Sequence, residues 1–309
     1  MVSGKSHQRL GFGLSSACLA YGICMYQTLV CLFTLLLSSN VYAQTGSAIN
    51  STKTNISGKT KFFPKASGRA KPAISSSGVA VVNAASFLPG VSPGALVTIF
   101  GSNLSDVSGV VVANTDPLPY ELAQVSVDIN GVPAPIFSVA YNGTEDQISV
   151  QVPYATVTGQ GAATVQVFDY GDLVGSVQTD SFDEDPGIFT YQGNYAVALR
   201  FPDYSLVGPG NPVSPGDYLI VYTTGLGPLS LNLTDGYGAP SNPPAYTQDP
   251  FTVTVDGESC NVSFSGAAPG FVGLYQLNIQ LPFDLPSGNL NLQIASPFAN
   301  SNIVNLPVF

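Results

Sequence analysis

From residue 78 to its end the chain alternates short apolar runs with turn residues, and no helical period is sustained there. Segments rich in β-branched and aromatic residues, several of them alternating apolar and polar positions, occupy residues 96–100, 125–129, 148–152 and 163–168. Alternation over four to eight residues is typical of half-buried β-strands. The pattern therefore predicts an all-β fold.

Turn signals separate these segments. Asn130-Gly131 and Asp256-Gly257 are residue pairs that accept positive φ, and each predicts a hairpin turn. Pro153 and Pro282 are expected to end their strands, because proline has no N–H to donate to a strand ladder.

The same blocks occur twice in the same order. Val-Ser-Pro-Gly at 91–94 returns at 213–216, and Gln-Ile-Ser-Val-Gln-Val-Pro at 147–153 returns as Gln-Leu-Asn-Ile-Gln-Leu-Pro at 276–282. The two copies of these blocks lie 122 and 129 residues apart. These separations exceed the roughly 20–50 residues of solenoid repeats and indicate a duplicated domain. About seven strands per copy, with turns every 8–12 residues, predict tandem immunoglobulin-like β-sandwiches. The predicted domains are residues 79–183 and 184–309.

The N-terminal part predicts export. Residues 1–43 have the form of a signal peptide, with Lys5 and Arg9 ahead of an apolar run at 29–37 and Val-Tyr-Ala at 41–43. An uncleaved anchor is the alternative. After residue 43 no apolar stretch approaches the roughly 20 residues needed to span a bilayer. We expect a secreted or cell-surface protein with no membrane span once the signal is removed.

Charge is divided unevenly along the chain. Residues 44–78 form a predicted flexible linker with six bases and no acid, whereas from residue 73 onward Arg200 is the single base against all 19 acids. An acidic body repels phosphate, so nucleic acid is excluded as a partner of the folded part. The linker is interpreted as a solvated spacer, with contact to an anionic envelope polymer or folding back on the acidic domains as alternatives.

Two strings of residues carry a family resemblance. One is Val-Asn-Ala-Ala-Ser at 82–86 with Ser-Pro-Gly at 92–94 and Val-Thr-Ile-Phe-Gly at 97–101. The other is Pro-Gly-Ile-Phe at 186–189 with Tyr-Thr-Thr-Gly-Leu-Gly-Pro at 222–228. Together they resemble the uncharacterised C-terminal domain family of secreted acidobacterial (Solibacter-type) proteins, whose domains look like paired IPT/TIG immunoglobulin-like modules. The resemblance implies a fold and brings no catalytic or ligand residues with it.

The residue inventory argues against an enzyme. Gly90-Val91-Ser92-Pro93-Gly94 matches the G-x-S-x-G pattern of nucleophile elbows, but Pro93 has no N–H for an oxyanion. His7 is the only histidine and lies in the signal segment. Without a histidine, Ser-His, Cys-His and ordinary zinc chemistry are excluded from the folded part. A carboxylate-based hydrolase is the weakest alternative.

Two groups of residues are candidate sites. The acids Asp180, Asp183, Glu184 and Asp185 cluster at the predicted domain junction and offer hard oxygen ligands for Ca²⁺, the alternative being a solvated hinge. Tyr237 and Tyr246 lie in a long Gly/Pro loop at 231–250, which is either a ligand-contact loop or packed on its own domain.

These observations predict a non-enzymatic, exported immunoglobulin-like protein for binding, adhesion or assembly, with no cofactor unless Ca²⁺ binds. Its partner is expected to be a surface protein or a polysaccharide. A calcium- or carbohydrate-dependent recognition module is the alternative. Cys260, the one cysteine after residue 31, is expected at a small buried position, with a reactive or dimer-forming thiol as the alternative.

Overall fold

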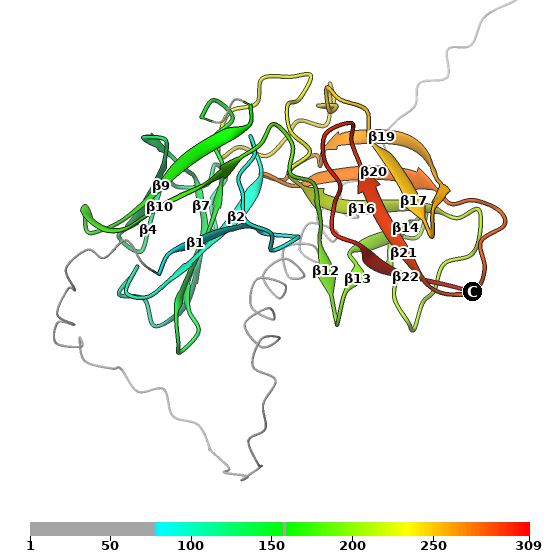
Figure 1. Cartoon of the computed structure of the whole chain (residues 1–309), viewed down its shortest axis with the longest axis horizontal. Coiled ribbons are helices and arrows are strands. Elements are labelled where there is room, and N and C mark those ends of the chain that lie inside the picture. The colour runs from blue at the N-terminus through cyan, green and yellow to red at the C-terminus, as the bar shows by residue number, and fades with distance from the viewer. Residues whose placement is uncertain (1–77, 157–158) are drawn as a thin grey trace, which may run out of the picture. The chain divides into compact units, whose positions relative to one another are not determined.

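The computed structural model describes residues 78–156 and 159–309, and every regular element in them is a β-strand (Figure 1). The all-β prediction is confirmed. The predicted signal peptide and most of the predicted basic linker lie outside the described residues. In the described ranges no helix is long and apolar enough to cross a membrane.

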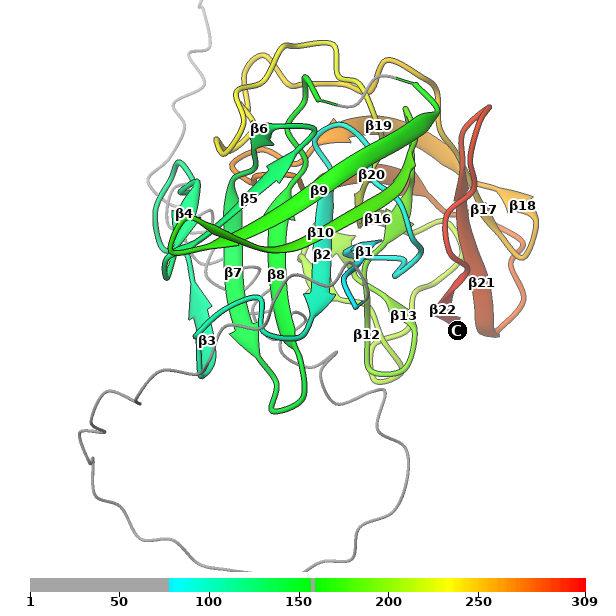
Figure 2. The same cartoon turned by 60° about the vertical axis from the view of Figure 1, so that its left-hand side comes forward.

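The first sandwich consists of two antiparallel sheets that share one apolar core. In β5 (Val125–Ile129) the alternate residues Val125, Val127 and Ile129 are buried, as the sequence pattern predicts. In Figure 2, β9 (Gly161–Asp169) and β10 (Asp172–Ser181) cross in front of β7 (Ile136–Tyr141), β8 (Asp146–Gln151) and β2 (Leu96–Gly101). One sheet has the order β1 (Ala80–Asn83), β2 (Leu96–Gly101), β8 (Asp146–Gln151), β7 (Ile136–Tyr141), β3 (Gly109–Val112). The other has the order β10 (Asp172–Ser181), β9 (Gly161–Asp169), β5, β4 (Glu121–Leu122), with β6 (Val132–Pro133) also paired to β5.

The second sandwich repeats this plan around its own core. Its strands pair antiparallel except β13 with β22, which run parallel at Tyr195 and Asn305. One sheet has the order β15 (Ser205–Leu206), β14 (Ala198–Phe201), β16 (Tyr218–Thr224), β20 (Tyr275–Gln280), β19 (Asn261–Ala267), with β11 (Gly187–Ile188) on β16. The other has the order β12 (Thr190–Tyr191), β13 (Tyr195–Ala196), β22 (Val304–Val308), β21 (Gly288–Ala295), β17 (Thr252–Val255), β18 (Glu258–Ser259).

Both predicted hairpin turns are confirmed. Asn130-Gly131 joins β5 to β6 with φ of 52° and 77°, and Asp256-Gly257 joins β17 to β18 with φ of 48° and 89°. Two consecutive positive φ values are what a type I′ turn requires. Tyr170-Gly171 makes a third such turn, between β9 and β10, that the sequence pattern did not single out.

The two cores are separate clusters of buried residues. The first runs from Val81 to Val167 and the second from Ile188 to Val308. The predicted boundary at residues 183 and 184 lies between them, and its position stays a prediction.

Candidate functional site

The two sandwiches are joined through buried polar contacts, and Thr224 at the end of β16 makes the central one. Its side chain is 0% exposed. Its Oγ1 accepts a hydrogen bond from Leu96 N of the first sandwich at 2.8 Å and donates to Gly273 O of the second at 2.8 Å. Tyr275, also fully buried, donates from its hydroxyl to Gly227 O at 2.9 Å. Each of these groups would be costly to bury without a partner.

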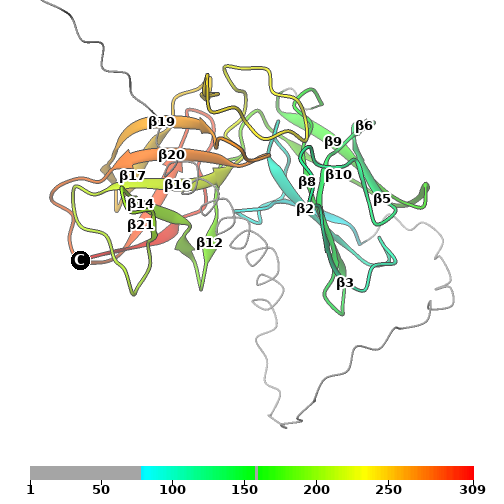
Figure 3. The ribbon, with the colours of Figure 1, turned by 180° about the vertical axis from the view of Figure 1, so that it is seen from behind.

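The long loop of the second sandwich, yellow in Figure 3, is also tied to the first sandwich. Gly236 N donates to Gln151 Oε1 at 2.7 Å, and Gly236 O accepts from Leu118 N at 2.8 Å. Asp235 Oδ1 accepts from Tyr154 N at 2.9 Å. Three hydrogen bonds made by two adjacent loop residues therefore hold the loop against the other sandwich.

The two loop tyrosines have different surroundings. Tyr246 packs against the ring of Phe264 in its own sandwich, with ring centroids 5.2 Å apart, yet 48% of it stays exposed. Tyr237 is 51% exposed. The role of these tyrosines in ligand contact stays a prediction. The ring contact of Tyr246 with Phe264 lies within its own sandwich.

The structure brings three of the four predicted junction acids together and leaves one apart. Asp183, Glu184 and Asp185 line one pocket of about 380 Å³. Asp180 lies on β10 outside this lining, where its carbonyl accepts a hydrogen bond from Val91 N. The remaining pocket walls come from Gln160, Phe182, Phe298 and Ala299, and we call this site the junction pocket.

Glu184 is the most unusual residue of the junction pocket. Only 3% of it is exposed, and within the described part of the chain neither carboxyl oxygen makes a hydrogen bond of 3.5 Å or less, although the Ser296 hydroxyl and the Asp249 carboxyl lie close enough to shift its pKa. Burial raises the pKa of Glu184, the Ser296 hydroxyl opposes the rise, and the nearby carboxyl groups of Asp249 and Asp183 add to it. A buried carboxylate without a positive partner is unfavourable, so this group is available to an incoming cation or proton.

Asp185 is held by the first sandwich. Asn83 Nδ2 donates to the Asp185 carbonyl at 2.7 Å and to its carboxyl Oδ2 at 3.2 Å. Asn83 Oδ1 in turn accepts from Ala85 N at 2.8 Å, which fixes the amide orientation. Burial raises the pKa of Asp185 to about 6, and the hydrogen bond from Asn83 opposes the rise.

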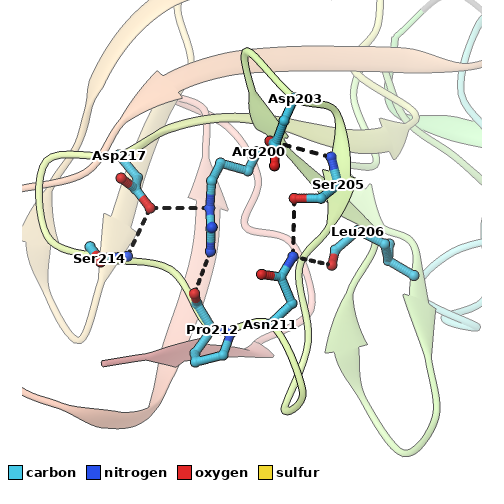
Figure 4. A network of polar contacts seen from close by, with 8 residues as sticks. All are labelled: Arg200, Asp203, Ser205, Leu206, Asn211, Pro212, Ser214 and Asp217. Atoms are coloured by element: carbon cyan, nitrogen blue, oxygen red, sulfur yellow. Dashed lines mark hydrogen bonds and ion pairs between the residues drawn. The ribbon is translucent and has the colours of Figure 1, made fainter.

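The protein's folded part has no spare base for these acids. Arg200, the single base after residue 72, forms an ion pair from Nε to Asp217 Oδ2 at 3.2 Å and also donates to Pro212 O (Figure 4). Asp217 Oδ2 further accepts from Ser214 N at 2.8 Å, in the second copy of the Ser-Pro-Gly turn. The arginine therefore secures a turn of the second sandwich and does not line the junction pocket.

No group of three or more His, Cys, Asp or Glu side chains that could hold a metal ion occurs within residues 78–156 and 159–309. Asp183 already accepts a hydrogen bond from Gly159 N at 2.6 Å through Oδ1. Calcium at Asp180, Asp183, Glu184 and Asp185 stays a prediction.

The junction acids lead to a first testable expectation, in the pH dependence of stability. Burial gives Asp185 a pKa of about 6 in the folded state, against 3.8 for an unperturbed carboxyl group in the unfolded state. Between pH 3.8 and about 6 the folded state therefore binds more protons than the unfolded state. Stability therefore falls as pH rises through this window, by at most about 3 kcal/mol. Urea unfolding at pH 4.5 and pH 7 measures the difference. Asp185→Asn should flatten it, and an unchanged slope in that variant would contradict the assignment.

Ser92 and Cys260, which the sequence offered as a nucleophile and a reactive thiol, are both accounted for by packing. Ser92 is 0% exposed, and its carbonyl accepts from Ala95 N at 3.1 Å, so the G-x-S-x-G match is a buried turn. Cys260 packs against the second core, and burial raises the pKa of its thiol to about 12. A thiol with so high a pKa is almost entirely protonated at neutral pH, as expected of an inert packing residue.

Comparison with known proteins finds distant structural similarity. No family model and no curated protein sequence matches the chain. Among solved structures, SGBP-B of the Bacteroides ovatus mixed-linkage glucan utilization locus, in complex with a heptasaccharide, is 12% identical, with a TM-score of 0.30. The match covers 71% of this chain and 43% of that one.

Two further similar structures are repeat or surface proteins. The I9–I11 tandem of titin is 12% identical over 71% of this chain and 62% of that one, with a TM-score of 0.18. Domains 4–9 of the surface layer protein SbsC are 13% identical over 75% of this chain and 31% of that one, with a TM-score of 0.21. The chain thus spans less than two thirds of each of these proteins. The strand order, two sheets around one core in each half, makes the halves immunoglobulin-like sandwiches, while the acidobacterial family and the IPT/TIG subtype stay predictions.

Proposed function

We propose that this chain is an exported, non-enzymatic binding protein whose junction pocket takes a positively charged group of its partner. The observation that carries the proposal is Glu184, a buried carboxyl group without a basic partner in the described residues, in the wall of an acidic pocket. An ammonium or guanidinium group there would donate charge-assisted hydrogen bonds to carboxylates that burial disfavours.

The apolar walls narrow the choice of ligand. Phe182 and Phe298 line the same pocket as the acids, and Phe298 is 70% exposed. An aromatic ring beside a carboxylate suits the aliphatic stem and charged head of lysine or arginine, through apolar contact and cation–π attraction. A basic segment of a protein partner fits this pocket better than a bare ion.

Titration of the full chain with a short lysine-rich peptide tests this function. We expect saturable binding, and we expect Glu184→Gln/Asp185→Asn to weaken it at least about 10-fold, since two charge-assisted hydrogen bonds are each worth about 1.5–3 kcal/mol. The matched control is Asp106→Asn/Asp284→Asn, which removes the same charge from acids that do not line the pocket. Equal weakening by both double variants would show that the net charge of the protein alone causes the effect, and it would contradict the proposal.

The polysaccharide alternative stays a prediction. A depression of about 510 Å³ on β17 and β21 supports it, because Thr254, Asn291 and Gln293 line it with neutral hydrogen-bonding groups beside the carboxyl group of Asp256. Such groups are suited to hydroxyl-rich ligands.

A further inference from the structure

We infer that the outer face of the sheet β15–β14–β16–β20–β19 binds a neutral polysaccharide, whose sugar rings stack on exposed aromatic side chains and whose hydroxyl groups bond to a row of amides. We call this surface the aromatic face, and it is defined by Phe201, Tyr218, Phe264, Gln276, Asn278 and Gln280. It shares no residue with the junction pocket, and it lies on the other sheet of the second sandwich from the depression on β17 and β21.

The strand register places these six side chains on the side of the sheet away from the core. Residues directly opposite each other on paired strands project to the same side. Phe201 lies opposite Tyr218, and Tyr218 lies opposite Gln280. Asn278 lies opposite Phe264. The apolar residues that alternate with them in β16 and β20 belong to the second core, whereas none of the six does. Figure 3 shows β14, β16, β20 and β19 side by side.

Aromatic rings are exposed on both sides of this face. Phe201 and Tyr218 are each 50% exposed, and Tyr204 packs edge-on against Phe201 with ring centroids 5.8 Å apart. Across the sheet, the half-exposed Tyr246 packs against Phe264. Neighbouring strands are about 4.8 Å apart, so β14 and β19 place these two ring pairs about 14 Å from each other. Grouped exposed rings mark an interaction surface and supply flat apolar platforms.

A row of three amides runs along β20 between the rings. Gln276, Asn278 and Gln280 alternate there with buried core residues. Gln276 Nε2 donates to Asn278 Oδ1 at 3.1 Å, and Gln280 Nε2 donates to Gly216 O at 3.4 Å. Within the described residues, the amide oxygens of Gln276 and Gln280 and the amide nitrogen of Asn278 make no hydrogen bond. The row therefore offers a ligand both acceptors and a donor.

Charge and hydrogen-bonding capacity select the ligand. None of the six residues is charged, and the chain from residue 73 onward carries 19 acids against one base, so an anionic polymer is repelled. Sugar hydroxyls both donate and accept, which matches the amide row. A proline-rich peptide, another ligand of exposed rings, has no N–H at its prolines to donate to the amide oxygens. A neutral polysaccharide therefore fits the aromatic face better than either.

Native affinity electrophoresis of the full chain, in gels that contain soluble starch, hydroxyethyl cellulose or galactomannan, tests the inference. We expect at least one of these neutral polymers to slow migration. Tyr218→Ala should then weaken binding at least about 10-fold, because the stacking platform is lost, whereas Tyr218→Phe should retain most of it. The matched control is Tyr170→Ala, which removes an exposed tyrosine of the first sandwich. Normal migration in all three gels, or equal weakening by the two alanine variants, overturns the inference.

A pair of amide variants separates the polysaccharide from other occupants. Asn278→Leu removes hydrogen bonding from the aromatic face and keeps apolar contact, so affinity for the polysaccharide should fall about 5-fold. Gln293→Leu is its control, since this amide lies in the depression on the other sheet. Tighter binding by Asn278→Leu overturns the inference in favour of an apolar contact. A loss confined to Gln293→Leu overturns it in favour of the depression on β17 and β21.

The junction pocket and the aromatic face are tested separately by the same proteins. Glu184→Gln/Asp185→Asn should leave polysaccharide binding unchanged, and Tyr218→Ala should leave binding of the lysine-rich peptide unchanged, because the two surfaces share no residue. A proline-rich peptide that binds the full chain and is lost with Tyr218→Ala, while no polysaccharide binds, overturns the inference in favour of a protein segment and leaves the proposed function standing.

Discussion

Replacing Gly225 with alanine is expected to destabilise the protein by at least about 3 kcal/mol. A Cβ at this position would stand 2.0 Å from the Asp185 carbonyl oxygen, and φ is +77°, a conformation that side chains other than glycine adopt with strain. The obstacle is backbone, which cannot rotate away as a flexible side chain could. Equilibrium unfolding in urea measures the loss.

Gly270 supplies the matched control for this substitution. Its φ is +83°, close to that of Gly225, but nothing lies within 4 Å of a Cβ built on it. Gly270→Ala should therefore cost only the conformational strain, about 1 kcal/mol. If the two alanine variants lose equal stability, the close approach of Gly225 to Asp185 does not exist in solution.

Thr224→Val is expected to cost about 2–4 kcal/mol, because it leaves a buried donor and a buried acceptor without their partner. The substitution keeps the shape of the side chain and removes Oγ1, which links Leu96 N to Gly273 O. Because Leu96 belongs to the other sandwich, thermal unfolding should also lose cooperativity between the two halves. Differential scanning calorimetry reports both effects.

Thr223, the residue before Thr224, provides the comparison for this substitution. Thr223 is likewise 0% exposed, but its Oγ1 finds no hydrogen-bond partner in the described residues. Thr223→Val removes a buried polar group that contributes no hydrogen bond, so stability should stay within about 1 kcal/mol of wild type or rise. A loss for Thr223→Val as large as that for Thr224→Val would show that neither hydroxyl is used as the structure indicates.

Local patterns predicted the elements well because their causes are local. Alternation at residues 125–129 placed every second side chain in the core, and the strand is β5 with those bounds. The pairs Asn130-Gly131 and Asp256-Gly257 made the expected turns because positive φ is a property of those residue types. Tyr170-Gly171 was missed because tyrosine is not a residue that signals such a turn, and its φ of 51° follows from the pairing of β9 with β10.

The repeated motifs have a second role that their sequences do not show. Gly225 lies in one of the strings that carry the family resemblance, yet it and Gly273 lie where the sandwiches approach each other. A Cβ on Gly273 would come within 2.8 Å of Leu96 in the other sandwich. The long loop at 231–250, the most divergent part of the second copy, is held to the first sandwich through Asp235 and Gly236. Contacts between segments more than 80 residues apart depend on how two folded bodies meet, which no local pattern encodes.

By itself the sequence determined the all-β class, the duplication, the division of charge between a basic segment and an acidic body, and the absence of histidine chemistry after residue 7. These follow from composition and short-range periodicity. The tertiary structure alone decided that Asp183, Glu184 and Asp185 share a pocket with Phe298 while Asp180 does not, and that Glu184 is buried without a basic partner among the described residues. The physical reason is that burial and pairing depend on which surfaces meet, and Phe298 lies more than 110 residues along the chain from the acids beside it.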